Sequence, residues 1–173
     1  MSLRAQYFKR AFIASLIASV TASWQQVHAE VGNVDMLTLG CTGCHGREGV
    51  SVGQASPSIA GFNMRYLFRV MRQFRDGERA ATIIDRLASA YTTKELRLIS
   101  TYFSEKPWGN ADAIIDERKF LKGSELHEKH CEECHQQGGQ EQDHEVPRLA
   151  GQWPSYLFYQ MQDYRDRPGK MTQ

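Results

Sequence analysis

The sequence predicts an all-α protein of two tandem domains, the second of which is C-terminally incomplete. The first observation is a Cys-x-x-Cys-His motif, which occurs at residues 41–45 and again 90 residues later at 131–135. The second is a pattern of apolar residues at the i, i+3, i+4 and i+7 spacing of amphipathic helices. The third is length, because 173 residues hold two domains of roughly 75 residues and a short leader.

The same offset relates many other residues, with no gap between the two copies. The matches are Gly49 with Gly139, Pro57 with Pro147, Ala60-Gly61 with Ala150-Gly151, Tyr66-Leu67-Phe68 with Tyr156-Leu157-Phe158, Met71 with Met161, and Arg75-Asp76 with Arg165-Asp166. Matches that keep one register from the cysteines into a following helix indicate a duplicated domain rather than two chance motifs.

Residues 1–29 have the composition of a signal peptide. Three basic residues precede an apolar run at residues 11–20, and Val27-His28-Ala29 provides small residues before a cleavage site. The apolar run is too short to span a bilayer, and an uncleaved anchor is the alternative. We therefore expect an exported, periplasmic protein.

The Cys-x-x-Cys-His motif is typical of covalent haem attachment. Two thiols three positions apart lie on one side of a helical turn, where they can form thioethers with the two vinyl groups of one porphyrin. The next histidine is then held beneath the iron as its proximal ligand. We expect two covalently attached haem c groups, bound by the thioether cysteines Cys41, Cys44, Cys131 and Cys134 and by the axial histidines His45 and His135.

Other metal or redox sites are the alternatives for an isolated Cys-x-x-Cys pair. Such a pair can be half of a zinc site or a redox dithiol, and His127 and His130 add candidate ligands beside the second motif. The first copy has no extra histidine nearby, so two copies in register favour haem. All four cysteines belong to the motifs, which leaves none for a disulfide.

Charge argues against nucleic acid as a partner. Of the 21 Lys and Arg residues, three lie in the leader, so 18 positive charges face 20 Asp and Glu in the mature chain, a formal charge of −2. A chain without a basic stripe cannot neutralise phosphates along a nucleic acid.

The first domain, residues 30–107, is expected to contain three main helices. A short helix over 31–40 leads into the motif, and a Gly-, Ser- and Pro-rich loop over 46–58 follows it. Residues 63–75 form an amphipathic helix, whose arginines we assign to its solvated face, with an ion pair between one of them and a haem propionate as the alternative. A Thr92–Glu95 capping box begins a closing helix.

Residues 108–119 are expected to be a linker, and residues 120–173 the second domain. This domain has a leading helix over 123–130, a polar loop over 136–146 and a helix over 153–166. Only 22 residues follow Gly151, so no segment remains to match the closing helix of the first domain. We interpret the second domain as truncated and the chain as a fragment of a longer one. Because each half is small, we expect it to depend on its haem for a core.

With these residues identified, the sequence resembles the dihaem cytochrome subunits of flavocytochrome c sulfide dehydrogenases, within the two-domain class I cytochromes c. The resemblance covers most of residues 34–173. It rests on the two motifs, on Ser51 to Ala60, on Thr82 to Ala88 before Tyr91, and on Leu149-Ala150-Gly151-Gln152-Trp153. The resemblance implies electron transfer from an FAD-containing flavoprotein subunit to a soluble acceptor such as a small cytochrome.

The resemblance also implies the ligands of each iron. Pro57 and Pro147 would accept the Nδ1 proton of the proximal histidines, and a methionine would be the sixth ligand. The family usually has Met where this chain has Ile84, so the sixth position of the first haem is either vacant or filled by another methionine such as Met64. Met171 is the candidate sixth ligand of the second haem. His127, His130 and His144 are the alternative ligands near the second haem.

Two further functions remain alternatives. One is a free-standing dihaem shuttle with no flavoprotein partner. The other is a haem peroxidase-like enzyme with an open iron, an interpretation that Ile84 supports and that the lack of a marked distal acid–base pair opposes. If the protein takes electrons from a flavoprotein subunit, the flavin would lie on that other chain, because this sequence has no FAD motif.

Overall fold

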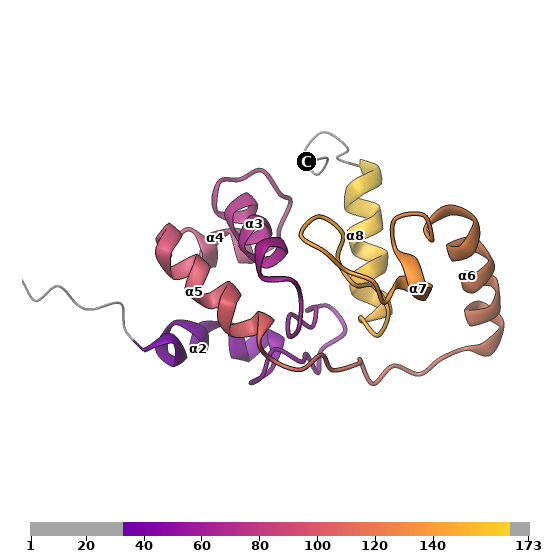
Figure 1. Ribbon diagram of the computed structural model, residues 1–173, viewed down its shortest axis with the longest axis horizontal. Helices are drawn as coiled ribbons and strands as arrows, with labels where there is room; N and C mark the ends of the chain where they lie inside the picture. The colour runs from indigo at the N-terminus through magenta and orange to yellow at the C-terminus, as the bar shows by residue number, and fades with distance from the viewer. Residues whose placement is uncertain (1–32, 167–173) are drawn as a thin grey trace, which may run out of the picture. The chain divides into compact units, whose positions relative to one another are not determined.

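The computed structural model describes residues 33–166, and every regular element in that range is a helix (Figure 1). The elements are α2 (Val34–His45), α3 (Met64–Arg75), α4 (Ile84–Ala88), α5 (Thr93–Ser104), α6 (Glu117–His130), α7 (Gln136–Gly139) and α8 (Pro154–Asp166). No strand occurs in the described range, so the all-α prediction is confirmed. None of the helices within 33–166 has the length and apolar character needed to cross a bilayer. The expected signal peptide lies outside the described residues.

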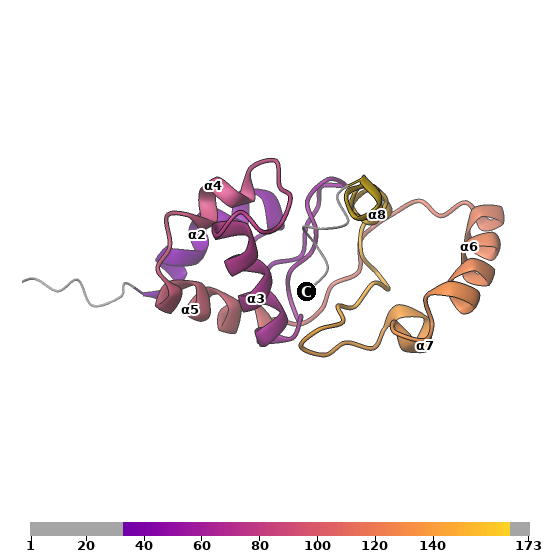
Figure 2. The same cartoon turned by 90° about the horizontal axis from the view of Figure 1, so that it is seen from above.

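The described chain has a first half that contains α2 to α5 and a second half that contains α6 to α8. Helices α2 to α5 enclose the core of the first half. α3 packs against α4 and α5, and α2 packs against α5, as the two views in Figures 1 and 2 show. The central cluster is formed by Phe62, Leu67, Ile99 and Phe103, each less than one tenth exposed. Trp108 closes the cluster by packing edge-on against Phe62, with 5.2 Å between ring centroids.

Side-chain caps begin the longer helices. Asn63 Oδ1 accepts a hydrogen bond from the Arg65 amide at 2.9 Å at the start of α3. The predicted capping box is confirmed: Glu95 N donates to Thr92 Oγ1 and Thr92 N donates to Glu95 Oε2, at 3.3 and 2.7 Å. These contacts satisfy backbone groups that a helix end leaves unpaired.

The helices that lead into the two motifs are longer than the sequence patterns indicate. α2 continues through the first motif, so its last turn carries the cysteines and His45. α6 begins at Glu117, three residues before the expected start of the second domain, and Asp116 caps it by accepting from the Arg118 amide at 3.0 Å. The second motif then lies in a series of turns after His130.

The second half has little core of its own. Neither α6 nor α8 contains a buried residue. Several of their large apolar side chains are more than half exposed, namely Phe120, Leu121, Leu126, Phe158, Tyr159 and Met161. No described helix of this half corresponds to α5. In Figures 1 and 2, α6 lies at the opposite end of the molecule from α2 to α5, and α8 lies between them.

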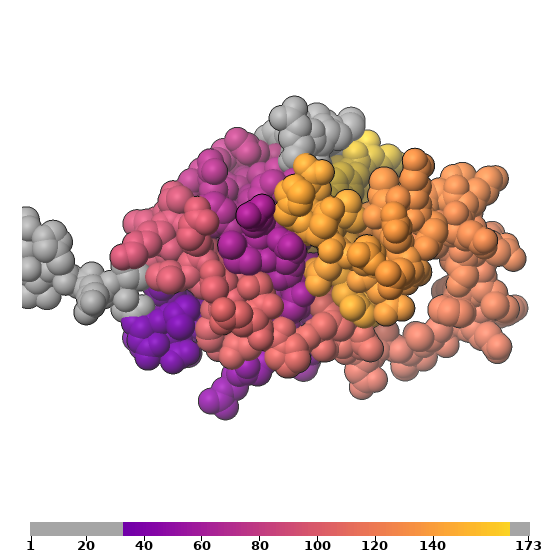
Figure 3. Space-filling view, viewed as in Figure 1, coloured from indigo at the N-terminus to yellow at the C-terminus, as the bar shows by residue number. Residues whose placement is uncertain are grey.

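Residues 140–153, a segment of the second half, make non-covalent contacts with the first half. The space-filling view in Figure 3 shows orange atoms of this segment directly against the magenta atoms of the first half. Hydrogen bonds cross the contact: Gln142 Nε2 donates to the Gly61 carbonyl at 2.7 Å, and Ala111 N donates to the Gly151 carbonyl at 2.7 Å. The first half thus provides a surface on which the loop of the second half is ordered.

Candidate haem sites

The first motif presents two thiols from the last turns of α2. Cys41 is half-buried and Cys44 is exposed, and neither forms a disulfide. Burial, with a smaller contribution from Cys44, raises the pKa of the Cys41 thiol to about 11. The two thiols lie three positions apart in a helix and form no disulfide, so they are available for thioether attachment.

His45 is held in one tautomer by the loop that follows α2. Its Nδ1 atom lies 2.8 Å from the Pro57 carbonyl oxygen. A carbonyl can only accept, so Nδ1 carries the proton and the neutral ring keeps a lone pair on Nε2. Burial lowers the pKa of His45, against a smaller opposing effect of the Pro57 hydrogen bond, and this favours the neutral ring. A neutral imidazole with a free Nε2 is a suitable iron ligand.

The second motif repeats this arrangement without a regular helix. His135 N donates to the Cys131 carbonyl at 2.8 Å, which closes one helix-like turn across the motif. His135 Nδ1 lies 3.1 Å from the Pro147 carbonyl oxygen, the same twelve-residue separation as between His45 and Pro57. The hydrogen bonds expected for both prolines are therefore present.

Two glycines fold both loops in the same way. The Gly49 carbonyl accepts from the Ala60 amide at 3.0 Å, and the Gly139 carbonyl accepts from the Ala150 amide at 2.9 Å. Their φ angles, +81° and +82°, lie in the left-handed region that favours glycine. Each loop thus returns to its starting point and brings a proline carbonyl beside a histidine.

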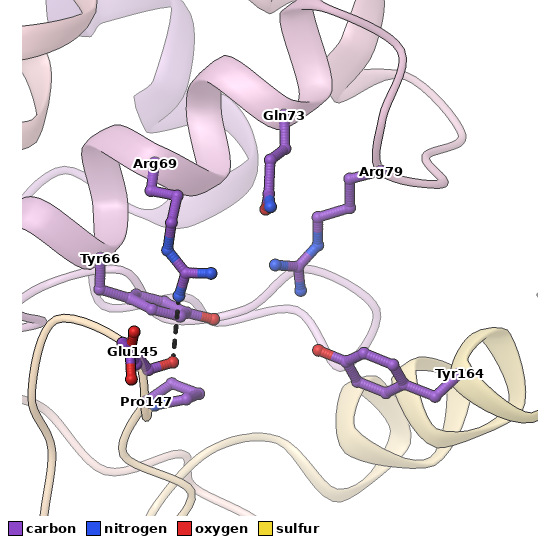
Figure 4. A pocket seen from close by; sticks show the side chains of 7 residues that line it. All are labelled: Tyr66, Arg69, Gln73, Arg79, Glu145, Pro147 and Tyr164. Atoms are coloured by element: carbon purple, nitrogen blue, oxygen red, sulfur yellow. Dashed lines mark hydrogen bonds between the residues drawn. The ribbon is translucent and has the colours of Figure 1, made fainter. Parts of the chain in front are cut away.

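A pocket of about 340 Å³ lies between the halves (Figure 4). It is lined by Tyr66, Arg69, Gln73, Arg79, Glu145, Pro147 and Tyr164. Arg69 Nη2 donates to the Glu145 carbonyl at 3.0 Å, and the guanidinium of Arg79 points into the same space. Pro147, which accepts from His135, also lines the pocket, so it adjoins the second motif.

Arg79 fits an anionic group in this pocket. The residue is only 8% exposed, and its Nε atom is buried with no hydrogen-bond partner. Its Nη2 atom donates to Gln160 Oε1, a neutral amide, and no carboxylate of residues 33–166 forms an ion pair with it. A buried guanidinium without a counter-charge is unfavourable, and a carboxylate is its best geometric match. The propionate groups of a haem are carboxylates of this kind.

No protein-family model matches the sequence. The cytochrome subunit of sulfide dehydrogenase from Chlorobaculum tepidum is 39% identical over 69 residues, which are 40% of this chain and 62% of that relative. The thiosulfate dehydrogenase electron acceptor of Thiomonas intermedia is 28% identical over 166 residues, which are 90% of this chain and 73% of the relative. The chain is a relative of the dihaem class I cytochromes c.

The fold of this cytochrome agrees with that relationship. The crystal structure of cytochrome c4 from Pseudomonas stutzeri matches it with a TM-score of 0.69 and 23% identity, over 77% of this chain and 78% of the other. The likeness confirms the predicted architecture of helical cytochrome c domains in tandem. The alignment with the Chlorobaculum subunit spans less than two thirds of that protein's length.

Three histidines outside the two motifs lie within the described residues, and the buried Nε2 atom of His127 has no hydrogen-bond partner. His127 Nδ1 lies 3.1 Å from Glu132 Oε2, while His130 and His144 are exposed. Within residues 33–166, no three His, Cys, Asp or Glu side chains are grouped so that they could hold a metal ion.

Three residues bear on the sixth ligands of the two irons, and two of them lie within the described residues. Ile84 is the half-buried first residue of α4 and has no atom that can bind iron. Met64, another methionine of the first half, is the half-buried first residue of α3. Met171, the candidate for the second haem, lies outside the described residues.

Sequence reasoning missed part of the pocket. The sequence predicts that the arginines of residues 63–75 face solvent or that one of them meets a propionate, but it does not single out Arg69, which lines the pocket because the second half covers that part of α3. Arg79 lies beyond the end of α3, outside any periodic pattern, so contacts that form only in the folded chain, such as that with Gln160, 81 residues away, identify it.

Proposed function

We propose that this cytochrome is a periplasmic electron carrier with two covalent haem c groups. It would accept electrons one at a time from a dehydrogenase that oxidises a sulfur compound and pass them to a soluble acceptor. The role of the polypeptide is then to hold the haems, set their potentials and present them to partners, not to make bonds in a substrate. Bound haem would supply the one-electron exchange.

The proposal assigns a role to each motif residue. Cys41 and Cys44, and likewise Cys131 and Cys134, form the thioethers. His45 and His135 bind iron through Nε2, while the carbonyls of Pro57 and Pro147 hold Nδ1–H. Arg79 and Arg69 pair with propionates in the pocket between the halves.

The observation that carries the proposal is the repeated histidine–proline geometry. Two independent loops bring a proline carbonyl within 2.8 and 3.1 Å of Nδ1 of the histidine that follows the Cys-x-x-Cys pair. A redox dithiol has no need of such an arrangement, whereas a histidine that binds a metal through Nε2 does. The combination of this contact with two Cys-x-x-Cys-His motifs in register is what favours haem iron. The weakly packed second half supports the same conclusion, since an added apolar porphyrin would supply its missing core.

The identity of the electron donor is the finer part of the proposal. Similarity to the Chlorobaculum subunit supports a sulfide-oxidising flavoprotein with FAD on a separate chain. The Thiomonas relative, which aligns over 90% of this chain, supports thiosulfate dehydrogenase as a second candidate donor. Similarity to that acceptor also supports the alternative of a free-standing dihaem shuttle without a flavoprotein partner.

Rapid mixing of the oxidised cytochrome with each purified dehydrogenase and its substrate tests these candidates. Reduction of the haem bands by the sulfide-oxidising flavoprotein, and co-purification with a flavin chromophore, would support the first donor. Reduction only by thiosulfate dehydrogenase would support the second. Reduction by neither enzyme, with haem present, would reject the proposed donors. Fractionation of the cell envelope tests the periplasmic location.

Ile84 leads us to propose that the first haem is not an ordinary His/Met centre. A Met-to-iron charge-transfer band assigned to that haem would contradict this. An open iron would also bind small ligands and could turn over peroxide, which a direct assay for peroxide consumption measures. Peroxide turnover at the rate of a dedicated enzyme would favour the peroxidase-like alternative over electron transfer.

A further inference from the structure

Gln152, from the second half, is hydrogen-bonded within the loop that holds His45. This side chain is 5% exposed, and its Oε1 accepts from the Ser58 amide at 2.9 Å while its Nε2 donates to the Ser58 carbonyl at 2.9 Å. Oε1 also accepts from the Trp153 amide at 3.1 Å, so the amide group is fixed in one orientation. Ser58 itself is fully buried.

Trp153 strengthens the same contact. Its indole Nε1 donates to the Ser51 carbonyl at 3.0 Å. Ser51 in turn donates from Oγ to the Cys44 carbonyl at 3.2 Å, and from its amide to Ser58 Oγ at 3.1 Å. Two consecutive residues of the second half therefore hold both ends of the loop over 51–58.

The contact reaches His45 through a single peptide group. The Ser58 N–H that donates to Gln152 and the Pro57 C=O that accepts from His45 belong to the same peptide unit. A peptide group is planar and rigid, so fixing its N–H direction fixes the direction of its carbonyl. Hydrogen bonding at the N–H also polarises the carbonyl and strengthens the bond that it accepts.

The internal repeat lacks this feature in the other half. At the offset of 90 residues, Gln152 corresponds to Phe62, which cannot hydrogen-bond and instead packs edge-on against Trp108. Gln152 of the second half therefore holds the loop of the first motif, and the corresponding residue of the first half does not do the same for the second motif.

We propose that Gln152 is a positioning residue through which the second half sets the proximal hydrogen bond, and hence the reduction potential, of the first haem. This inference rests on the proposed role of His45. A stronger Nδ1–H···O bond makes an imidazole more basic and favours ferric iron. Weakening it by removing the Gln152 amide should raise the potential of the first haem.

The test compares Gln152→Met with Gln142→Met in the haem-loaded chain. Met keeps the length of the side chain and loses its hydrogen bonds. Gln142 is a matched control, because its amide also bridges the halves, donating to the Gly61 carbonyl at 2.7 Å and accepting from the Asn63 amide at 3.2 Å, but it does not touch the Pro57–Ser58 peptide. A spectroelectrochemical titration gives the two potentials, and NMR of ¹⁵N-histidine-labelled protein gives the exchange of the His45 ring proton.

We expect Gln152→Met to raise the potential of the first haem and to speed exchange of the His45 Nδ1 proton, while His135 is unchanged. The reduced-to-oxidised ratio at a fixed potential should rise by roughly tenfold at most, and tenfold corresponds to 59 mV for one electron. Gln142→Met should leave both readouts near the wild type. Equal shifts in the two variants, or no shift in Gln152→Met, would overturn the proposal.

Gln152→Glu provides a second test if the Met variant fails to accumulate. Glutamate still accepts from the Ser58 amide, so the exchange of the His45 ring proton should stay near the wild-type rate. Faster exchange in this variant would overturn the inference. A wild-type protein without a covalent haem spectrum would instead reject the proposed function, so the two failures are distinguishable.

Discussion

Gly49→Ala is the substitution for which the structure gives the clearest energetic expectation. Gly49 has a φ of +81°, and an added Cβ would lie 2.8 Å from Phe103 Cδ1 and 3.0 Å from the Ala60 amide nitrogen. The left-handed conformation costs a non-glycine residue about 1–2 kcal/mol. Forcing a methyl group into a packed core costs about 1–3 kcal/mol more. Together the two effects predict a loss of about 2–5 kcal/mol in the free energy of unfolding.

Two other glycines serve as controls for this prediction. At Gly139 the φ is +82°, but the added Cβ would meet its nearest atoms at 3.2 and 3.3 Å, so the loss should approach the conformational part alone. At Gly43, inside α2, an added Cβ meets nothing within 4 Å. Gly43→Ala should therefore be neutral, or stabilise the protein by up to about 1 kcal/mol through helix propensity.

Urea unfolding of the haem-loaded variants, followed by far-ultraviolet circular dichroism and by the haem band, measures these differences through linear extrapolation. From the most to the least stable, the expected order is Gly43→Ala, wild type, Gly139→Ala and then Gly49→Ala. A Gly49→Ala variant within about 0.5 kcal/mol of the wild type would refute the reasoning, because that is the range of unconstrained surface substitutions.

Three further predictions address the cap, the core and two half-buried phenols. Thr92→Ala removes the capping box and should lower the free energy of unfolding by about 1 kcal/mol, whereas unchanged urea midpoints would show that the cap is dispensable. Leu96→Ala, at a fully buried position, should cost about 2–5 kcal/mol, and a loss below 1 kcal/mol would contradict the assigned core. Burial raises the pKa of Tyr156 and of Tyr66, so their stabilising contribution is complete below pH 10 and is lost as the pH rises above it. An ultraviolet alkaline titration should show these two phenols ionising at a higher pH than the exposed tyrosines, and ionisation of all seven tyrosines near pH 10 in the folded protein would contradict the raised pKa values.

Features with local causes could be predicted from the sequence. The helix over 63–75 follows from periodicity, and the helix over 153–166 follows from its match to the first copy of the repeat. The Thr92–Glu95 box follows from a four-residue pattern whose partners are close in the sequence. The paired histidine–proline contacts could be expected only through the family resemblance, since each spans twelve residues of irregular loop.

Features that depend on contact between the halves could not be predicted. Gln152 binds Ser58 across 94 residues, and Arg79 binds Gln160 across 81 residues. Periodicity identifies the faces of a helix but does not say which face another domain will cover, so it does not distinguish Arg69 from the other arginines of α3. Such contacts require knowledge of how two duplicated domains pack, and a single sequence contains no pattern for it.

The most direct test of the central claim is the haem and thiol content of the exported protein. The account predicts two haems per chain that remain attached after denaturation, seen in the mass of the intact chain and in the alkaline pyridine spectrum, with no thiol available to a thiol reagent. A colourless protein in which Cys41, Cys44, Cys131 and Cys134 all react with that reagent would contradict it.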